Sequence, residues 1–317
     1  MQKVTIVTFL VSSVLTLVGG HAFSASVPKH LQKPKASNVV RPAVLAALNN
    51  KVVMSADQAI KIEEKNPDKK FAGVIGLTRG RSLVDFQDGS RQESMEYLFI
   101  PSYKFSYGSV SSKISYAQDL KDESPEASNI NDASITFAKT PLKWEWSPPY
   151  ILTLTPTLTA IVPLSRASIK RDQLQTAIIA GVSFGIIPDG LYKETGFSLA
   201  VGLTAGRNFH QFEESLNGAV ILNRYSSNQT LNLGYAYKKF SVGIEYIHRS
   251  RFSYQDTPKD SFALSEEIGY AINENFSVAI GHSNEALTGL EANGSEPSFK
   301  FINENASTVY AQLGISF

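Results

Sequence analysis

One short segment carries side chains that could do nucleophilic chemistry: Gly281, His282, Ser283 and Asn284. A histidine activates a serine hydroxyl only when the two side chains can reach each other. His282 and Ser283 are adjacent, and adjacent residues of a strand point to opposite faces, so on a regular strand they form no base–nucleophile pair. The sequence also lacks a phosphate-binding loop, a metal-ligand cluster and a cofactor fingerprint. We therefore expect no enzyme, no cofactor and no metal site.

The elements that would position any site alternate with a period of two. Between Tyr150 and Leu164 the even positions are mostly large and apolar, while the odd positions are mostly threonine. A helix would scatter both sets around its circumference, so this pattern predicts a strand with one apolar and one polar face. The same reasoning predicts about twelve strands, at residues 70–84, 93–107, 110–120, 132–146, 150–164, 173–187, 191–205, 227–237, 240–254, 261–272, 276–285 and 305–317.

The connections between these strands sort by length. After every even-numbered strand the turn is short, whereas most odd-numbered strands are followed by longer polar loops, most clearly at 119–131, 206–226 and 285–305. Aromatic residues gather beside the short turns and the C-terminus: Tyr107, Trp144, Trp146, Tyr150, Tyr235, Tyr237, Phe240, Tyr270, Phe276 and Phe317. Short turns on one side, long loops on the other and an aromatic girdle are typical of membrane barrels.

The chain ends in an alternating apolar run, with Leu313, Ile315 and the terminal Phe317 on one face. This end resembles the C-terminal assembly signal of bacterial outer-membrane β-barrel proteins, although Gln312 occupies the place where a glycine is common. From about Phe71 to Phe317 the chain resembles that class as a whole. The resemblance implies an all-β fold, a transmembrane antiparallel up-and-down barrel with both termini in the periplasm. It also implies contacts with outer-membrane lipids, including lipopolysaccharide, and with the barrel assembly machinery.

The alternative fold is a secreted soluble β-sandwich or lipocalin-like barrel, whose apolar face would point inward. The opposite face of the predicted strands carries Ser, Thr, Gly, Ala and Gln, which cannot form a dry core. We therefore expect the apolar face to contact lipid and the protein to be a monomer.

Charged residues on the lumen face suggest a constriction. The alternation places Lys104, Lys113 and Lys143 inward on three consecutive strands, and Glu245 and Glu267 inward on the opposite side. A basic wall facing an acidic wall would set up a transverse field across a water-filled passage. Glu145 on the basic wall and Glu266, which the alternation directs toward lipid, do not fit this division.

Further basic residues belong to the long-loop end of the predicted barrel. Arg249 and Arg251 face inward near its outer mouth, and Arg166, Lys170, Arg171 and Arg207 lie in or near the loops. They would attract anionic solutes or pair with lipid phosphates.

Three functions remain open at this point. The first is a narrow channel or uptake pore for small polar or charged solutes, and the second is a plugged barrel with a structural, anchoring or surface-interaction role. The third is an ester hydrolase similar to outer-membrane phospholipase A, a family that spaces its His and Ser two residues apart, unlike His282 and Ser283.

The N-terminal region and the composition complete the organisation. Residues 1–22 resemble a secretory signal peptide, with Lys3 followed by an apolar stretch and small residues. Residues 23–69 are predicted to form a tether with short helical segments, which either lies in the periplasm or plugs the lumen. Residues 70–317 are predicted to form the barrel. The absence of cysteine excludes disulfides, and the net charge of +1 gives no reason to expect nucleic acid. A mean hydropathy of -0.10 is too polar for a bundle of membrane helices.

Overall fold

The computed structural model describes residues 70–83, 93–121, 128–188, 195–216, 218, 220–286, 301–302 and 307–317. The predicted signal peptide and the tether at 23–69 lie outside these residues. Within the described residues, no helix is long and apolar enough to cross a membrane.

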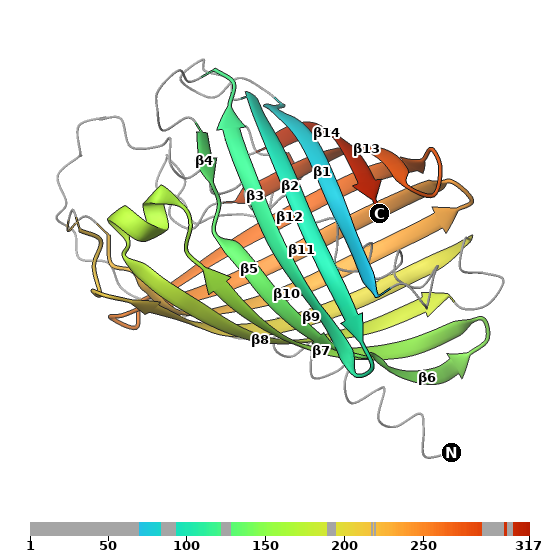
Figure 1. Cartoon of the computed structure of the whole chain (residues 1–317), viewed down its shortest axis with the longest axis horizontal. Helices are drawn as coiled ribbons and strands as arrows, with labels where there is room; N and C mark the ends of the chain where they lie inside the picture. Colours follow the sequence, from blue (N-terminus) through green and yellow to red (C-terminus); the bar gives the residue numbers. More distant parts are fainter. Residues whose placement is uncertain are drawn as a thin grey trace. The chain divides into compact units, whose positions relative to one another are not determined.

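The described chain forms one antiparallel sheet that closes on itself (Figure 1). Its strands are β1 (Phe71–Ser82), β2 (Glu93–Phe105), β3 (Gly108–Asp119), β4 (Ser128–Ile130), β5 (Ala133–Lys139), β6 (Leu142–Ser147), β7 (Tyr150–Val162), β8 (Leu174–Pro188), β9 (Thr195–His210), β10 (Asn223–Tyr237), β11 (Phe240–Ser253), β12 (Pro258–Ala271), β13 (Phe276–Ala286) and β14 (Ser307–Ser316). A five-residue π-helix, η1 (Ala167–Arg171), lies between β7 and β8.

The first and last strands close the barrel. β1 pairs with β14 from Val74 opposite Ser316 to Ser82 opposite Thr308, and β1 also pairs with β2. Closure leaves no open edge on these strands, which is what a barrel in lipid requires of its backbone. Twelve strand positions surround the lumen, with β5 and β6 sharing one and β4 added beside β3. The prediction of a twelve-stranded antiparallel barrel is confirmed.

Three differences from the predicted strands have local causes. The strand predicted at 132–146 is interrupted at Thr140 and Pro141, because proline has no N–H to donate to a ladder. The loop predicted at 119–131 contains β4, where Ile130 pairs with Tyr116. β9 and β10 continue beyond their predicted long-loop ends, since Arg207 still pairs with Tyr225.

The two faces of the sheet differ as the alternation predicts. Large apolar side chains are exposed on the outer face, among them Ile75, Leu158, Ile268 and Ile280. Aromatic residues beside the short turns are exposed as well, including Tyr107, Trp144, Tyr237 and Phe240. Among the described residues, buried polar side chains outnumber buried apolar ones and are mostly serine and threonine. The barrel therefore has no dry apolar core.

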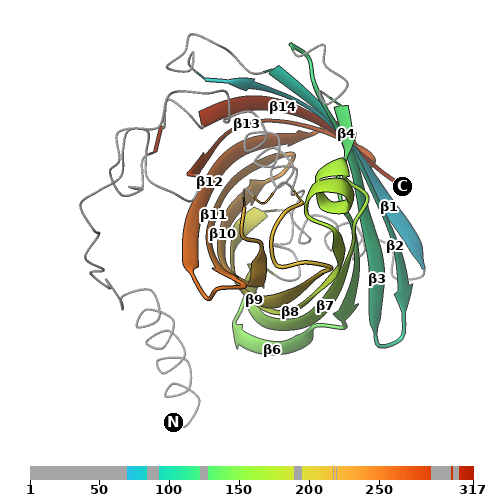
Figure 2. The same cartoon turned by 90° about the vertical axis from the view of Figure 1, so that its left-hand side faces the viewer.

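Viewed from the long-loop end, η1 and the chain between β9 and β10 lie within the outline of the barrel mouth (Figure 2). Two backbone hydrogen bonds join these segments: Gln211 N donates to Gln173 O at 3.0 Å, and Leu216 N donates to Arg171 O at 2.8 Å. The mouth is therefore lined by two loops that support each other.

Candidate functional site

Charged side chains from opposite walls of the barrel interact electrostatically with Lys113. Lys113 lies on the inner face of β3 and interacts electrostatically with Glu96 of β2 and with Glu245 of β11. β11 is six strand positions from β3 in either direction around the barrel. The interaction between Lys113 and Glu245 therefore crosses the lumen.

A second inward contact links β12 to β14. The Tyr310 hydroxyl donates a hydrogen bond to Glu267 at 3.1 Å, and Tyr310 also interacts electrostatically with Glu245. Between their strands, Gly281 of β13 leaves room for the tyrosine ring, because a Cβ at this position would lie 2.4 Å from Tyr310 Cζ. A side chain larger than glycine would displace the ring from Glu267.

Glu96 was missing from the residues predicted to line a constriction. The Glu96 residue is only 4% exposed, and its carboxylate interacts with Ser115 and with Lys113, both of β3. Thr78, the neighbour of Glu96 in register on β1, has a buried hydroxyl without a hydrogen-bond partner among the described residues. The signal was present in the sequence, since Glu96 and Lys104 are both even-numbered residues of one strand and share its inner face.

These five residues form the lumen cluster: Glu96, Lys113, Glu245, Glu267 and Tyr310. It contains three carboxylates and one ammonium group, so its formal charge is negative when all four groups are ionised. Such a cluster attracts cations and repels anions at its level in the lumen. It offers no nucleophile–base pair and no cofactor site.

The structure does not bring the other two predicted lysines into this cluster. Lys104 lies near the short turn of β2, opposite Ser109. Lys143 of β6 pairs with Thr153, toward the short-turn end of β7. Lys113 pairs with Ser134 of β5, and Ser134 in turn pairs with Ile161, near the long-loop end of β7. Lys104 and Lys143 retain the inward side of their strands but lie closer to the short-turn end. Their role in a constriction stays a prediction.

The arginines predicted at the outer mouth lie on the inner face of β11, near its long-loop end. Arg249 is opposite Asn228 and Ser261, and Arg251 is opposite Ser226 and Lys259. Arg249 is almost completely buried. Both residues have interaction partners within the protein, so they belong to a polar layer above the lumen cluster.

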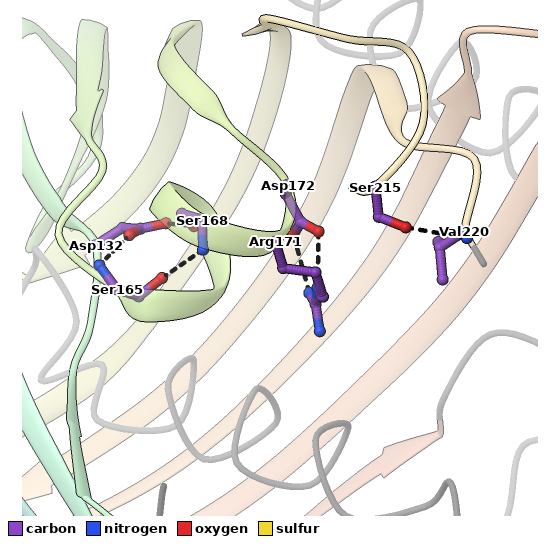
Figure 3. A network of polar contacts seen from close by, with 7 residues as sticks. All are labelled: Asp132, Ser165, Ser168, Arg171, Asp172, Ser215 and Val220. Atoms are coloured by element: carbon purple, nitrogen blue, oxygen red, sulfur yellow. Dashed lines mark hydrogen bonds and ion pairs between the residues drawn. The ribbon is translucent and has the colours of Figure 1, made fainter. Parts of the chain in front are cut away.

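A polar network fixes the loop that carries η1 (Figure 3). The Asp132 carboxylate accepts hydrogen bonds from Leu164 N at 3.0 Å, from Ser165 N at 2.9 Å and from the Ser168 hydroxyl. At the end of η1 the Arg171 guanidinium donates to Asp172 at 2.7 and 2.8 Å, which raises the pKa of Arg171 above its ordinary value. The arginine is therefore charged throughout the accessible pH range, and the Asp172 carboxylate balances its charge at the mouth.

The segment considered for nucleophilic chemistry is divided between the two faces of β13. His282 Nδ1 lies 2.8 Å from a Glu266 carboxylate oxygen. The pairing of β12 with β13 has no bulge at these residues, so both side chains point outward. The Ser283 hydroxyl lies on the other face, where it is 3.0 Å from the Thr308 hydroxyl. The structure thus separates the two side chains, as their adjacency predicts.

Two observations together decide the structural class: the closed antiparallel ladder, and an apolar outer face around a lumen of small polar residues. The architecture is that of an outer-membrane β-barrel. The sequence prediction of this class is confirmed, and such barrels reside in the bacterial outer membrane.

Comparisons of this outer-membrane barrel with known proteins gave only structural matches. Neither the protein-family models nor the curated proteins compared with the chain match it. An outer membrane channel from Pseudomonas putida F1 is 10% identical, with a TM-score of 0.49, and the match covers 78% of this chain and 95% of that one. The NanC porin is 10% identical at a TM-score of 0.44, with 77% and 98% covered. The KdgM porin is 9% identical at a TM-score of 0.37, with 77% and 99% covered.

Proposed function

We propose that this protein is a narrow outer-membrane channel for small polar or charged solutes and that the lumen cluster forms its constriction. The observation that carries the proposal is the electrostatic interaction of Lys113 with Glu245 from the opposite wall. Charged side chains that interact across the lumen concentrate an electric field at one level of the passage. Their field, and not only the width, then selects among solutes.

The excess of carboxylates in the lumen cluster favours cationic over anionic solutes at the constriction. The arginines above it act in the opposite sense, since Arg249 and Arg251 add positive charge near the long-loop end. A solute with both a positive and a negative group would satisfy both layers.

A specific observation supports a second candidate, the plugged barrel with an anchoring role. Val74 and Leu98 face inward on β1 and β2, and each is only 2% exposed. This side of the lumen is therefore filled at their level. A filled lumen conducts only if the remaining passage stays open or the filling group moves.

Single-channel recording in planar bilayers separates the two candidates. The channel proposal predicts discrete conductance steps for the purified mature protein in 1 M KCl. Conductance that appears only after deletion of residues 23–68 would support a plugged barrel instead. A barrel that is folded, by its heat-modifiable gel mobility, and silent in both forms would overturn the channel proposal.

The channel proposal includes an orientation, with the short turns and both termini in the periplasm. Because the chain has no cysteine, single cysteines report on it cleanly. On intact cells an impermeant maleimide should label Gln255→Cys, between β11 and β12, and should not label Lys238→Cys, in the short turn between β10 and β11. The reverse pattern would contradict the orientation.

A further inference from the structure

A histidine and a glutamate lie side by side on the lipid-facing surface of β12 and β13. Glu266 and His282 are directly opposite each other in the ladder, and His282 Nδ1 lies 2.8 Å from Glu266 Oε2. Both side chains point outward, as the alternation along their strands requires. We propose that this pair is the centre of an interface at which a second copy of the chain docks, so that the barrel is a dimer and not the monomer expected from the sequence.

The pair lies within the apolar band of the barrel. Phe276 begins β13 at the short-turn end, where the aromatic girdle is found. His282 is six residues further along, which is about 20 Å of strand and about 15 Å of height at a tilt of about 40°. The apolar band of such barrels is about 25 Å tall. The pair is therefore at a depth where lipid tails, and not headgroups or water, surround a single barrel.

The outward neighbours of the pair are apolar. In register, Ile244 of β11 flanks the pair on one side and Val309 of β14 flanks it on the other, and both are exposed. Ile268 and Ile280, the next outward residues toward the short turns, are 54% and 63% exposed. The surface thus combines an apolar surround with a polar centre. Association of membrane-spanning segments depends on such polar groups, which hydrogen-bond across the interface.

The pair does not satisfy all of its own hydrogen-bonding groups. A proton shared between His282 Nδ1 and Glu266 Oε2 leaves His282 Nε2 as a donor and Glu266 Oε1 as an acceptor. Both of these atoms are buried, and neither has a hydrogen-bond partner among the described residues. Lipid tails offer no hydrogen-bonding group, and an unsatisfied polar group in hydrocarbon is costly. The pair therefore calls for a partner that approaches from the lipid side.

A second outward histidine shows the contrast with a pair that has its partners. His248 Nδ1 lies 3.0 Å from Gln229 Oε1, and His248 Nε2 lies 3.5 Å from Asp260 Oδ1. The Asp260 carboxylate also accepts a hydrogen bond of 2.7 Å from the Ser250 hydroxyl. Asp260 is exposed and lies six residues closer than Glu266 to the long-loop end of β12, which places it beyond the apolar band. This second pair needs no docking partner.

A second copy of the chain supplies what the pair on β12 and β13 lacks. In a dimer with a two-fold axis along the membrane normal, each copy presents the same donor and the same acceptor in reverse order. His282 Nε2 of either copy then donates to Glu266 Oε1 of the other. The two side chains are 19% and 26% exposed, so a rotation of each side-chain end brings these atoms to the interface. A soluble periplasmic protein does not reach this depth, whereas a second copy has an apolar outer face of the same height.

Single-molecule photobleaching of the full-length mature protein, refolded into lipid vesicles and labelled at Gln255→Cys, tests the proposal. The wild type should bleach mostly in two steps. The double variant Glu266→Leu, His282→Leu should associate at least tenfold more weakly and bleach in one step. It should still fold, because leucine is an ordinary residue on a lipid-facing surface. The control His248→Gln, Asp260→Asn changes the other outward pair and should dimerise like the wild type.

Oxidative cross-linking of single cysteines locates the interface. Ile280→Cys, beside the pair, should give a covalent dimer, whereas Leu158→Cys, which is exposed on β7 six strand positions away, should not. If the double leucine variant does not fold, Glu266→Gln should weaken association several-fold, because its acceptor is no longer charged.

Four results would overturn the proposal. They are single-step bleaching of the wild type, equal association of the folded leucine variant, equal cross-linking at Leu158→Cys, and cross-linking of Ile280→Cys in native membranes to a different protein.

Discussion

The seam that closes the barrel depends on a close approach between Gly73 and the terminal residue Phe317. A Cβ at position 73 would lie 2.5 Å from Phe317 Cζ and 3.0 Å from both ring Cε atoms. Ordinary carbon contacts are about 3.5–4.0 Å. Gly73→Ala therefore has to displace the ring by about 1 Å or more. The backbone of Phe317 cannot follow easily, because it exchanges two hydrogen bonds of 3.0 Å with Gly73.

The cost of this displacement can be worked from the contacts of the ring. Phe317 packs against Phe71 and Phe99, and each aromatic pair contributes about 0.5–1.5 kcal/mol beyond its buried area. Losing both pairs costs about 1–3 kcal/mol. Replacing a strand glycine recovers about 0.5–1 kcal/mol of chain entropy. We therefore expect Gly73→Ala to lower the free energy of unfolding by about 0.5–2 kcal/mol.

Urea unfolding of the barrel in lipid vesicles, followed by tryptophan fluorescence, measures this change without the assembly machinery. The decisive comparison is a double-mutant cycle with Phe317→Ala, because Gly73→Ala should be neutral or stabilising once the ring is gone. Gly243→Ala is the control, since the nearest atom to its added Cβ is Leu233 O at 3.9 Å. If Gly73→Ala destabilises the protein equally with and without the Phe317 ring, the packing argument is refuted.

Three further predictions concern the lumen, the mouth and the excluded chemistry. Lys113→Glu changes the lumen by two charges, which at a distance of about 7 Å in water is about 1.2 kcal/mol. Cations gain this energy and anions lose it, so the cation-to-anion permeability ratio, from reversal potentials in 0.1 M KCl, should rise by up to about fiftyfold. The outward Lys139→Glu should leave the ratio unchanged, and an equal shift in both variants would place Lys113 outside the pathway. Asp132→Ala leaves Leu164 N and Ser165 N without their acceptor, so limited proteolysis should cleave the η1 loop several-fold faster, and unchanged cleavage would contradict the network. A fluorophosphonate probe should not label the protein. Labelling of the wild type that disappears in Ser283→Ala would support the ester hydrolase instead.

The strands were predictable because membrane strands carry one apolar and one small polar face. In β7 the alternation of leucine and threonine alone determines which side chains face outward. Strand ends were less predictable, since hydrogen-bonded pairing between Arg207 and Tyr225 continues into residues whose polar character resembles a loop. The interruption between β5 and β6 follows from Pro141, but the sequence alone does not show that both halves pair with the same neighbour.

The face of each charged residue was predictable, but its height in the barrel was not. Lys104, Lys113 and Lys143 lie at similar distances along the sequence from their short turns. However, the strands are staggered, so residues equally far from a turn lie at different levels around the wall. The pairing registers show this directly, since Lys143 and Lys113 align with opposite ends of β7. A site that spans several strands therefore requires the register as well as the alternation.

The same stagger explains why Glu96 matters to the lumen cluster. Glu96 and Lys113 lie on neighbouring strands, and Glu245 approaches the lysine from the opposite wall. One ammonium group thus interacts with two carboxylates from different directions, while Glu267 is held by Tyr310. Removing the ammonium group leaves Glu96 without the cation nearest to it in a buried position, which raises the cost of keeping that carboxylate charged. Lys113 therefore has two roles in the proposed channel: it sets the field at the constriction and stabilises the charged form of a buried neighbour.

Lys113→Met should consequently reduce both the anion permeability and the free energy of unfolding, whereas Lys113→Arg should preserve the stability.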